Sequence, residues 1–331
     1  MTRAIAGILG LGMAVPDKVL TNADLETMVD TTDEWIKTRT GISERHIAGP
    51  DDTTSSLSAK AAMAALDDAG IRPSEVDAII VATITPDMIF PSAACLVQDK
   101  IGARNAVAFD ISAGCSGFVY GVTLARSLIE SGTYRNILVV GAEVLSRITD
   151  WTDRSTCVLF GDGAGAAVLG PRSEGDEGPR IISTSLGSDG SGADLIHIPA
   201  GGSLMPASEE TVKNRLHFIS MAGNQVYKFA TKIMGDIALD ALQKCGLTKE
   251  DIDWFVPHQA NIRIILHAAD KLGLPMEKVF VNVERYGNTS AASIPIALFE
   301  ARKSGLIKPG NIVVLVGFGA GLTWGAAVVR W

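Results

Sequence analysis

The stretch GIRPSEVDAIIV at residues 70–81 recurs in altered form as GLTKEDIDWFV at residues 246–256. In each copy a glycine follows a helical pattern, and an aspartate precedes an apolar run of strand length. Because an internal repeat determines the architecture of a chain, this pair is the first guide to the fold. It predicts a molecule built from two similar halves.

Three more pairs of segments recur in the same order, so chance similarity within one doubly wound sheet is the weaker interpretation. Each copy reads as strand, helix, strand, helix, strand, strand, and we expect an α/β protein with two similar mixed sheets packed through helices. We place the halves at residues 1–172 and 173–331, with the boundary inside a charged, glycine-rich connection at 171–179. The further pairs are GCS at 114–116 with GNT at 287–289, NILVVG at 136–141 with NIVVLVG at 311–317, and GAAVL at 165–169 with GAAVV at 325–329.

The composition fits a globular protein of 331 residues, of which 47% are hydrophobic and 20% charged. No apolar run approaches the roughly 20 residues of a membrane span. The first residues lack the basic segment and cleavage site of a signal peptide, so we expect a cytoplasmic protein. The net charge of −8 argues against nucleic acid as a partner. The four cysteines are scattered, which indicates reduced thiols, and no cysteine or histidine spacing suggests a metal site.

Cys115 stands in the segment DISAGCSG at 110–117, where a strand pattern ends in small residues and a helix begins. A helix N-terminus stabilises a thiolate, so we expect a pKa below the usual value of about 8.5. The same N–H groups can contribute to an oxyanion hole. An inert, buried cysteine is the alternative, and by composition alone it is the commoner case. The glycines on both sides favour a nucleophile.

Asn288 occupies the equivalent turn of the second half, RYGNTSAAS at 285–293. If a two-fold axis relates the halves, the N-termini of both central helices meet near it, and Cys115 faces Asn288. His258 follows a predicted buried strand of the second half and is aimed at the same junction. The alternative for His258 is a structural histidine bonded to the backbone.

These three side chains together favour one kind of chemistry. A cysteine with a histidine can transfer acyl groups, while asparagine cannot titrate and serves as a donor. Two donors aimed at a thioester carbonyl stabilise the enolate that forms when a malonyl group loses CO2. The sequence therefore predicts decarboxylative carbon–carbon bond formation on an acyl-cysteine.

Two glycine-rich segments require interpretation. GDGAGA at 161–166 loosely fits a dinucleotide fingerprint, but it runs into a strand pattern, whereas phosphate-binding glycines open a helix. GFGAG at 317–321 is better explained as a tight turn that brings N–H groups to an acyl oxygen.

Six motifs together are more specific than any one of them: TDEWIKTRTGI at 32–42, DISAGCSGF at 110–118, FGDGAGA at 160–166, VPHQANIR at 256–263, YGNTSAASIP at 286–295 and GFGAG at 317–321. Through them the chain resembles the 3-oxoacyl-[acyl-carrier-protein] synthase III family over nearly its whole length. This resemblance implies a thiolase-like fold with five layers, αβαβα, and the initiating condensing reaction of type II fatty-acid biosynthesis. It implies an acyltransferase in which acetyl-CoA or a similar acyl-CoA acylates Cys115 before malonyl-acyl carrier protein enters, with no cofactor beyond the CoA thioester.

The resemblance also assigns residues to coenzyme A and to the active-site walls. Trp35 and Arg154 match the pair that sandwiches the adenine, with Arg39 as a further contact. The simpler alternatives are that Trp35 only packs and that Arg154 pairs with Asp153. Asn261 matches a residue that hydrogen-bonds within the active site. The pocket wall and the second oxyanion donor correspond to Phe318 and to the N–H of Ala320, where many relatives have glycine.

Partners follow from the same resemblance. Lys228, Arg263 and Lys271 match a basic patch that docks the acidic carrier protein. Phe90 resembles the residue that reaches into the neighbouring subunit's acyl pocket, which implies a homodimer. The alternatives are a sister condensing enzyme of secondary metabolism or of long-chain β-keto products, a thiol hydrolase that uses Cys115 and His258, and a noncatalytic partner subunit.

Overall fold

The computed structural model describes residues 5–173 and 176–331. The first half forms a mixed sheet with the strand order β5-β4-β6-β7-β1. β4 is parallel to both β5 and β6, whereas β7 is antiparallel to β6 and to β1. These strands are β1 (Ile5–Ala14), β4 (Ala78–Ala82), β5 (Val107–Ile111), β6 (Ile137–Glu143) and β7 (Gly163–Arg172).

The second half repeats this topology. Its strand order is β11-β12-β13-β8, with β11 parallel to β12 and the other two pairs antiparallel. A parallel bridge between Phe255 and Val279 takes the place of the β4–β5 pair. The predicted α/β class with two similar mixed halves is therefore confirmed. The strands are β8 (Arg180–Ser188), β11 (Trp254–Pro257), β12 (Ile312–Gly319) and β13 (Thr323–Arg330).

The two sets of strands also meet at one edge, which the sequence did not predict. Gly7 of β1 pairs with Arg180 of β8, so the described strands join into one continuous sheet of nine. Along the chain, β7 of the first set ends at Arg172, and β8 of the second set begins at Arg180. The boundary between residues 172 and 173 stays a prediction.

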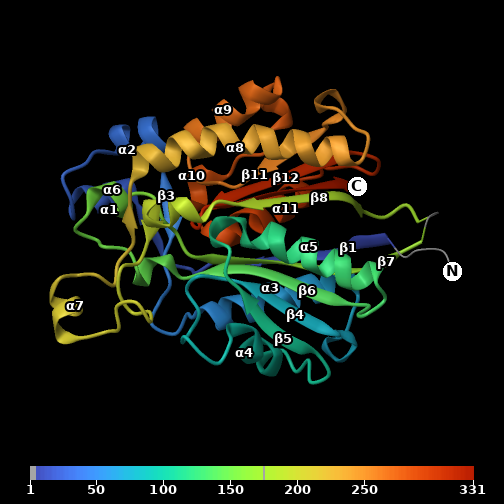
Figure 1. Cartoon of the computed structure of the whole chain (residues 1–331), viewed down its shortest axis with the longest axis horizontal. Helices are drawn as coiled ribbons and strands as arrows, with labels where there is room; N and C mark the ends of the chain where they lie inside the picture. Colours follow the sequence, from blue (N-terminus) through green and yellow to red (C-terminus); the bar gives the residue numbers. More distant parts are fainter. Residues whose placement is uncertain (1–4, 174–175) are drawn as a thin grey trace.

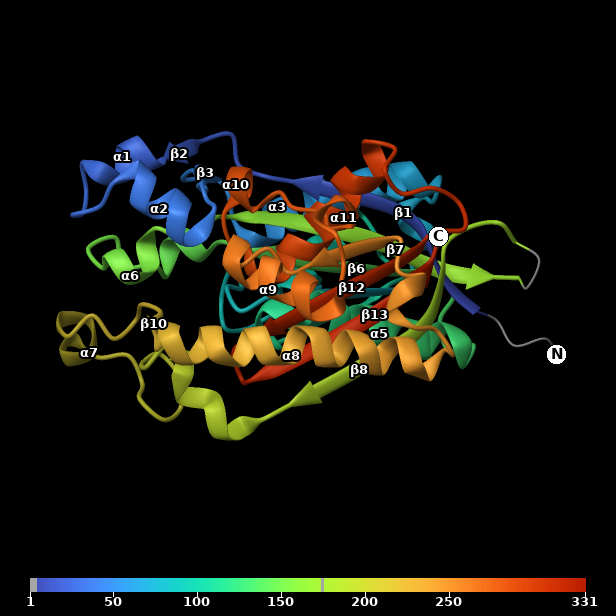
Figure 2. The same ribbon diagram turned by 90° about the horizontal axis from the view of Figure 1, so that it is seen from above.

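Six main helices complete the layers (Figures 1 and 2). α3 and α4 cover the outer face of the first set of strands, and α8 and α9 cover that of the second set. Between the sheets lie α5 and α11, whose apolar side chains meet both inner faces. The helices are α3 (Thr54–Ala69), α4 (Ala93–Lys100), α5 (Gly117–Glu130), α8 (Gly223–Lys244), α9 (Ile262–Leu272) and α11 (Ser293–Lys303).

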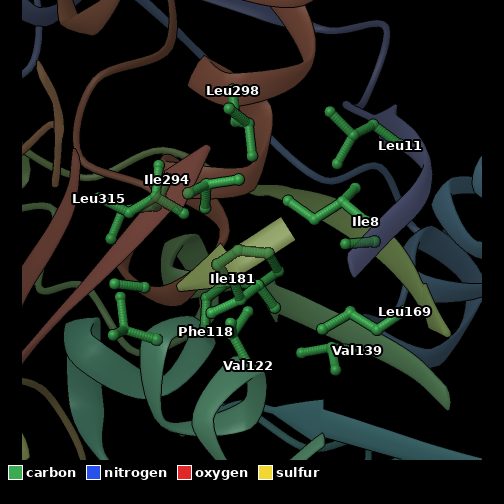
Figure 3. Packing of buried hydrophobic residues seen from close by; sticks show 14 of the residues in the cluster. Ile8, Leu11, Phe118, Val122, Val139, Leu169, Ile181, Ile294, Leu298 and Leu315 are labelled. Carbon is green, nitrogen blue, oxygen red and sulfur yellow. The ribbon is translucent and has the colours of Figure 1, made fainter. Parts of the chain in front are cut away.

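The central layer is the reason that the two halves form one body. Phe118 of α5 and Ile294 of α11 belong to the same buried cluster as Ile8, Leu169 and Leu315 from the strands (Figure 3). Fully burying a side chain of this size contributes about 1.5–3 kcal/mol. The N-terminal turns of both central helices are thereby held at one junction.

Of the shorter elements, α1, α2, α6, α7, β2, β3 and β10 gather at one end of the molecule, away from the C-terminus (Figures 1 and 2). Among the described residues, no helix has the length and apolar character needed to cross a membrane. The short helices and strands are β2 (Val19–Thr21), α1 (Asn22–Glu26), α2 (Asp33–Thr40), β3 (Glu44–His46), α6 (Arg154–Cys157), β9 (Ile196–His197), α7 (Glu209–Lys213), β10 (Ser220–Met221) and α10 (Val283–Tyr286). The 3-10 turns are η1 (Pro73–Glu75), η2 (Gly114–Ser116), η3 (Leu145–Arg147), η4 (Gly190–Leu195), η5 (Lys249–Asp251), η6 (Met276–Lys278) and η7 (Ser290–Ala292).

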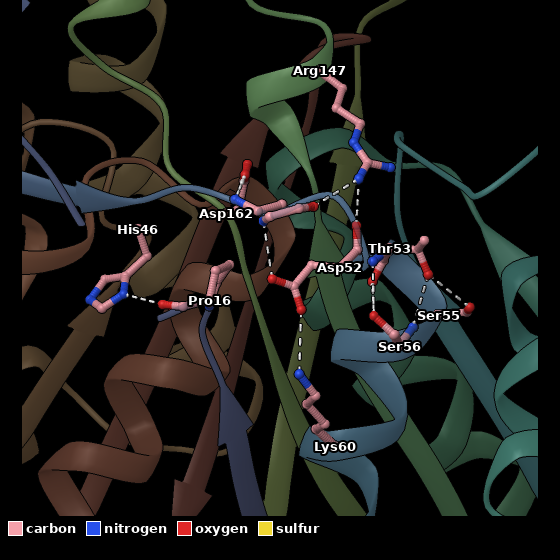
Figure 4. A network of polar contacts seen from close by, with 11 residues as sticks. Pro16, His46, Asp52, Thr53, Ser55, Ser56, Lys60, Arg147 and Asp162 are labelled. Carbon is pink, nitrogen blue, oxygen red and sulfur yellow. Dashed lines mark hydrogen bonds and ion pairs between the residues drawn. The ribbon is translucent and has the colours of Figure 1, made fainter. Parts of the chain in front are cut away.

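The glycine-rich segment at 161–166 has a structural explanation. Asp162 is buried, and its carboxylate accepts hydrogen bonds from the N–H groups of Ala48 and Ser146. Nearby, Arg147 donates to the backbone carbonyl of Asp52 at 2.6 Å (Figure 4). The glycines then continue into β7, as the sequence indicated. The segment ties β7 to the loop after β3.

Candidate active site

Cys115 lies in η2, between the end of β5 and the first turn of α5. The backbone of β12 passes so close that a Cβ at Gly319 would stand 2.3 Å from the Cys115 nitrogen. A Cβ at Gly114, whose φ is +52°, would likewise stand 2.8 Å from the nitrogen of Ala320. Both contacts require glycine. The two glycine-rich motifs therefore hold the turn that carries Cys115 against the C-terminal strand.

The Cys115 thiol does not have the lowered pKa that its place near a helix N-terminus suggested. Burial raises its pKa to about 12, and the nearby Glu143 carboxyl acts in the same direction. The N–H groups at the helix start are also already used, since Ser116 and Gly117 donate to the carbonyls of Ala113 and Gly114. The expectation of a lowered pKa was wrong. The resting thiol is protonated and needs a proton acceptor.

His258 follows β11 directly and is 1% exposed. Its Nδ1 lies 2.6 Å from the hydroxyl of Ser293, the first residue of α11, and its ring packs edge-on against Phe318. Burial lowers the pKa of His258 to about 3, so the imidazole is neutral near pH 7. A neutral ring whose Nδ1 is occupied has only Nε2 left for another ligand.

Asn288 precedes η7 and is 8% exposed. Its backbone N–H donates to the carbonyl of Leu159 at 2.8 Å, and its Oδ1 accepts from the N–H of Ser290 at 2.9 Å. Since the amide oxygen is occupied, the NH2 group remains as the donor.

These three side chains line one cavity of about 180 Å³, although they come from distant parts of the chain. Asn261, Phe318 and Ala320 belong to the same wall, as do further residues that the sequence did not single out: Leu159, Phe160, Ile196, Met221, Gly223, Val226, Tyr227, Ala260, Ile264 and Gly319. We call this space the entrance cavity. It brings together the predicted thiol, imidazole and carboxamide.

A second cavity of about 200 Å³, the apolar cavity, also reaches Cys115. The linings of the two cavities share Cys115, Phe160, Ile196 and Ala320, so the thiol stands where they meet. Its lining is almost entirely hydrocarbon. Gly114, Phe160 and Ser290 come from the motifs of the sequence analysis, whereas no motif includes His197, Ile84, Leu145, Ile196, Ile198 or Ile219. Their apolar patterning alone is typical of any core.

Trp35 and Arg154 are brought together, but they stack on each other. The Arg154 guanidinium lies 5.0 Å from the centre of the Trp35 ring, within cation–π range. Arg154 also donates to the carbonyl of Asp30 at 2.7 Å, whereas Asp153 caps α6 by accepting from the N–H of Ser155. The alternative pairing of Arg154 with Asp153 is therefore not what the structure shows.

Asn261 connects the entrance cavity to α2. Its Oδ1 accepts from the N–H of Arg263 and caps α9, while its Nδ2 donates to the carbonyl of Arg39 at 3.0 Å. Both ends of the side chain are thus occupied by protein. The side chain of Arg39 itself is exposed.

The three basic residues lie on α8 and α9, the two helices beside the entrance cavity. Lys228 is exposed, and the guanidinium of Arg263 lies over the ring of Tyr227, which lines that cavity. Lys271 forms an ion pair with Asp236 at 2.6 Å, which offsets part of its charge. Phe90 is 84% exposed and is absent from the lining of both cavities.

Comparison with known proteins agrees with this geometry. Family models for 3-oxoacyl-[acyl-carrier-protein] synthase III match residues 109–190, and for its C-terminal part residues 242–331. The chain is 58% identical over 326 residues to beta-ketoacyl-[acyl-carrier-protein] synthase III of Caldanaerobacter subterraneus subsp. tengcongensis, covering 98% of each chain. The crystal structure of 3-oxoacyl-[acyl-carrier-protein] synthase III from Aquifex aeolicus superposes with a TM-score of 0.90 at 48% identity, covering 98% of this chain and 100% of that one.

A more distant solved relative is the priming beta-ketosynthase of the R1128 polyketide pathway. It has a TM-score of 0.90 and is 37% identical, covering 99% of this chain and 97% of that one. The higher identities belong to synthase III proteins. The chain is therefore an acyltransferase of fatty-acid biosynthesis and belongs to the 3-oxoacyl-[acyl-carrier-protein] synthase III family of initiating condensing enzymes.

Proposed function

We propose that this enzyme condenses acetyl-CoA or a similar short acyl-CoA with malonyl-acyl carrier protein, giving 3-oxoacyl-carrier protein, CO2 and CoA. The observation that carries the proposal is the convergence of Cys115, His258 and Asn288 on the entrance cavity. The thiol also opens onto the apolar cavity, which suits the hydrocarbon part of an acyl group.

Acylation is the first step. The sulfur of Cys115 attacks the thioester carbonyl, the carbon–sulfur bond to CoA breaks, and CoA leaves as a thiol. The N–H groups of Cys115 and Ala320 flank the place where the carbonyl oxygen becomes an oxyanion, since these two backbones meet at the Gly114 and Gly319 contacts.

Condensation is the second step. The malonyl thioester oxygen accepts hydrogen bonds from Nε2 of His258 and Nδ2 of Asn288, which stabilise the enolate as CO2 departs. The carbanion attacks the acyl-Cys115 carbonyl, and the cysteine sulfur leaves. For His258 to donate from Nε2, Ser293 must donate its hydroxyl proton to Nδ1, a geometry that the 2.6 Å contact allows.

Residues around the entrance cavity bind the two molecules that carry the thioesters, CoA and the carrier protein. Arg154 and Trp35 separate to admit the adenine of CoA, with Arg39 beside them, so CoA enters as a substrate and no resident cofactor is required. Arg263 and Lys228, with the partly neutralised Lys271, attract the acidic carrier protein to the cavity mouth. The reaction takes place in the cytoplasm.

A second copy of the chain completes the molecule. The edge strand β5 presents Val107 and Phe109 at 42% and 37% exposure, next in the sheet to no other described strand on that side. Ile89 and Phe90 are even more exposed. An open edge with apolar side chains favours pairing with another strand, and a homodimer satisfies this requirement.

The proposal is tested by following acyl transfer from radiolabelled acetyl-CoA to the protein. Cys115→Ala should abolish the covalent label, because it removes the only sulfur that the entrance and apolar cavities share. Cys95→Ala, which changes an exposed thiol, is the matched control and should label normally. Persistent label on the Cys115 variant would exclude this nucleophile, and transfer to water without malonyl-carrier protein would indicate a thiol hydrolase.

A further inference from the structure

A buried carboxyl lies beside the nucleophile and takes no part in the steps above. Glu143 is the last residue of β6 and is fully buried. Within the described part of the chain its four partners are neutral donors, with no lysine or arginine among them. Burying an ionised carboxyl group costs free energy unless hydrogen-bond donors surround it.

The donors around Glu143 are arranged for a carboxylate. Thr85 Oγ1 accepts from the N–H of Val144 and donates to Glu143 at 2.5 Å. Thr83 Oγ1 accepts from the N–H of Thr85 and donates at 3.2 Å. The N–H of Ile84 adds a third bond at 3.2 Å. Each threonine hydroxyl oxygen already accepts a hydrogen bond from a backbone N–H, so the hydroxyl proton is directed at the carboxyl oxygens.

Ser290 links this carboxyl to the active site. Its hydroxyl donates to Oε1 of Glu143 at 3.1 Å, and the residue lines the apolar cavity together with Cys115, whose thiol lies within hydrogen-bonding reach of it. The residue has a φ of +48°, a conformation that side chains other than glycine rarely adopt. Such strain persists where the surrounding structure enforces it, often at functional sites. Here it places the hydroxyl between the thiol and the carboxyl.

The thiol therefore has two separate polar neighbours. His258 and Asn288 line the entrance cavity, whereas Ser290 lines the apolar cavity, and Cys115 belongs to both. His258 can keep its Nε2 proton for the malonyl oxygen only if another group takes the thiol proton. Glu143, reached through Ser290, is a group placed to do so.

We propose that Ser290 and Glu143 form a proton relay that serves Cys115. As the sulfur–carbon bond to the acyl group forms, the thiol proton passes to Ser290 Oγ, and the Ser290 proton passes to the Glu143 carboxylate. The CoA thiolate that departs takes a proton from water. The products of this step are acyl-Cys115, neutral Glu143 and CoA thiol.

Condensation then returns the stored proton. When the carbanion displaces the cysteine sulfur, the thiolate receives the proton of Ser290, which is replaced from Glu143. Over both steps one proton from water is consumed and one CO2 is released, and Glu143 ends as a carboxylate. Ser290 touches the reacting sulfur, while Glu143 acts through it as a positioning residue.

The relay rests on the proposal that Cys115 carries the acyl group, and the test separates the two. The measurement is the single-turnover rate of acylation by acetyl-CoA, read by mass spectrometry of the intact protein at several pH values. Ser290→Gly removes the hydroxyl and suits the positive φ, so this variant keeps its fold. Glu143→Gln keeps the size of the side chain and removes its basicity. Ser58→Ala, which changes another buried serine, is the control.

Ser290→Gly and Glu143→Gln should each slow acylation about 100-fold, the range of a general base, and the double variant should be no slower than either. Burial raises the pKa of Glu143 to about 7, and the carboxylate is the acceptor, so the wild-type rate should rise with pH through this value. Among the described residues the Cys115 thiol is the titratable group that interacts with Glu143. The inflection near this pH should disappear in both single variants.

Three outcomes would overturn the relay. The first is acylation of Ser290→Gly at the wild-type rate, and the second is an unchanged pH profile in that variant. The third is additive losses in the double variant, which would mean that the two residues act independently. If Cys115→Ala still becomes labelled, the nucleophile assignment fails instead, which is a different result from any of these.

Discussion

Asn288 and His258 each have one side-chain atom already hydrogen-bonded to the protein, which orients them for their proposed roles. Ser290 holds the amide oxygen of Asn288, and Ser293 holds Nδ1 of His258. Each side chain therefore keeps one nitrogen for a ligand. A preorganised donor of this kind costs little reorganisation when charge develops on the substrate oxygen.

Replacing Asn288 should separate the two steps. Asn288→Ala and Asn288→Asp both remove the donor, although the aspartate keeps the oxygen that accepts from Ser290. Each variant should still form acyl-Cys115 but condense roughly 100- to 1000-fold more slowly, the loss that follows removal of one oxyanion donor. Acylation is measured by mass spectrometry and condensation by CO2 release. Equal losses in both steps would show that Asn288 only supports the turn.

The sequence was sufficient to predict that Cys115, His258 and Asn288 meet at one cavity, but not to predict the residues that surround them. Cys115, His258 and Asn288 stand in motifs whose spacing and residue types point to their chemistry. Glu143 and Ser290 are separated by 147 positions, and only the fold brings them together. The thiol pKa was misjudged because burial, which the sequence does not give, outweighs the helix end.

At the scale of elements, η2 is fixed by the strand that passes behind it. Gly317 and Gly319 of β12 both face this turn, and an added Cβ would meet Ser116 or Cys115 within about 3 Å. Similar contact occurs where Gly141 of β6 meets the carbonyl of Ala291 in η7. Backbone packed against backbone leaves the turns that carry Cys115 and Asn288 little freedom.

Gly319→Ala should therefore disturb the site from a position outside the reaction. Its Cβ would stand 2.3 Å from the Cys115 nitrogen and 3.2 Å from its Cβ, so η2 must shift. We expect a loss of about 1–3 kcal/mol in the free energy of unfolding, with slower acylation, measured by thermal unfolding and by label transfer. Gly190→Ala, where the added methyl meets nothing within 4 Å, is the matched control. A variant as stable and as active as that control would contradict this account.

The elements themselves were largely predictable from the sequence. Gly70 and Gly246 have φ values of +65° and +72°, as expected for glycines that follow a helix, and the apolar runs after Asp77 and Asp253 are β4 and β11. The pairing of Gly7 with Arg180 had no sequence signal, because one residue pair at a sheet edge leaves no periodic pattern. The apolar cavity likewise had no sequence signal, because its lining residues are scattered along the chain.

At the scale of the whole molecule, the repeat explains why the site lies where it does. Both halves place the N-terminus of a central helix at the same junction, and the halves differ in the side chains that they present there. The first half contributes the thiol and its carboxyl neighbour, and the second contributes the imidazole and the carboxamide. Neither half alone holds all four of these groups.

The edge strand β5 yields the prediction for the assembly. In an antiparallel pair of two β5 strands, the side chains of one copy lie opposite those of the other, so a charge placed there meets its own copy. Phe109→Lys should weaken the proposed dimer at least about 10-fold, that is, by roughly 1.4 kcal/mol or more. Met63→Lys, on the outer helix α3 with the same 37% exposure, should leave it intact. Sedimentation across a concentration series measures both. A wild-type chain that sediments as a monomer, or a Phe109 variant that dimerises like the control, would remove β5 as the interface and leave Phe90 without a neighbouring subunit to reach.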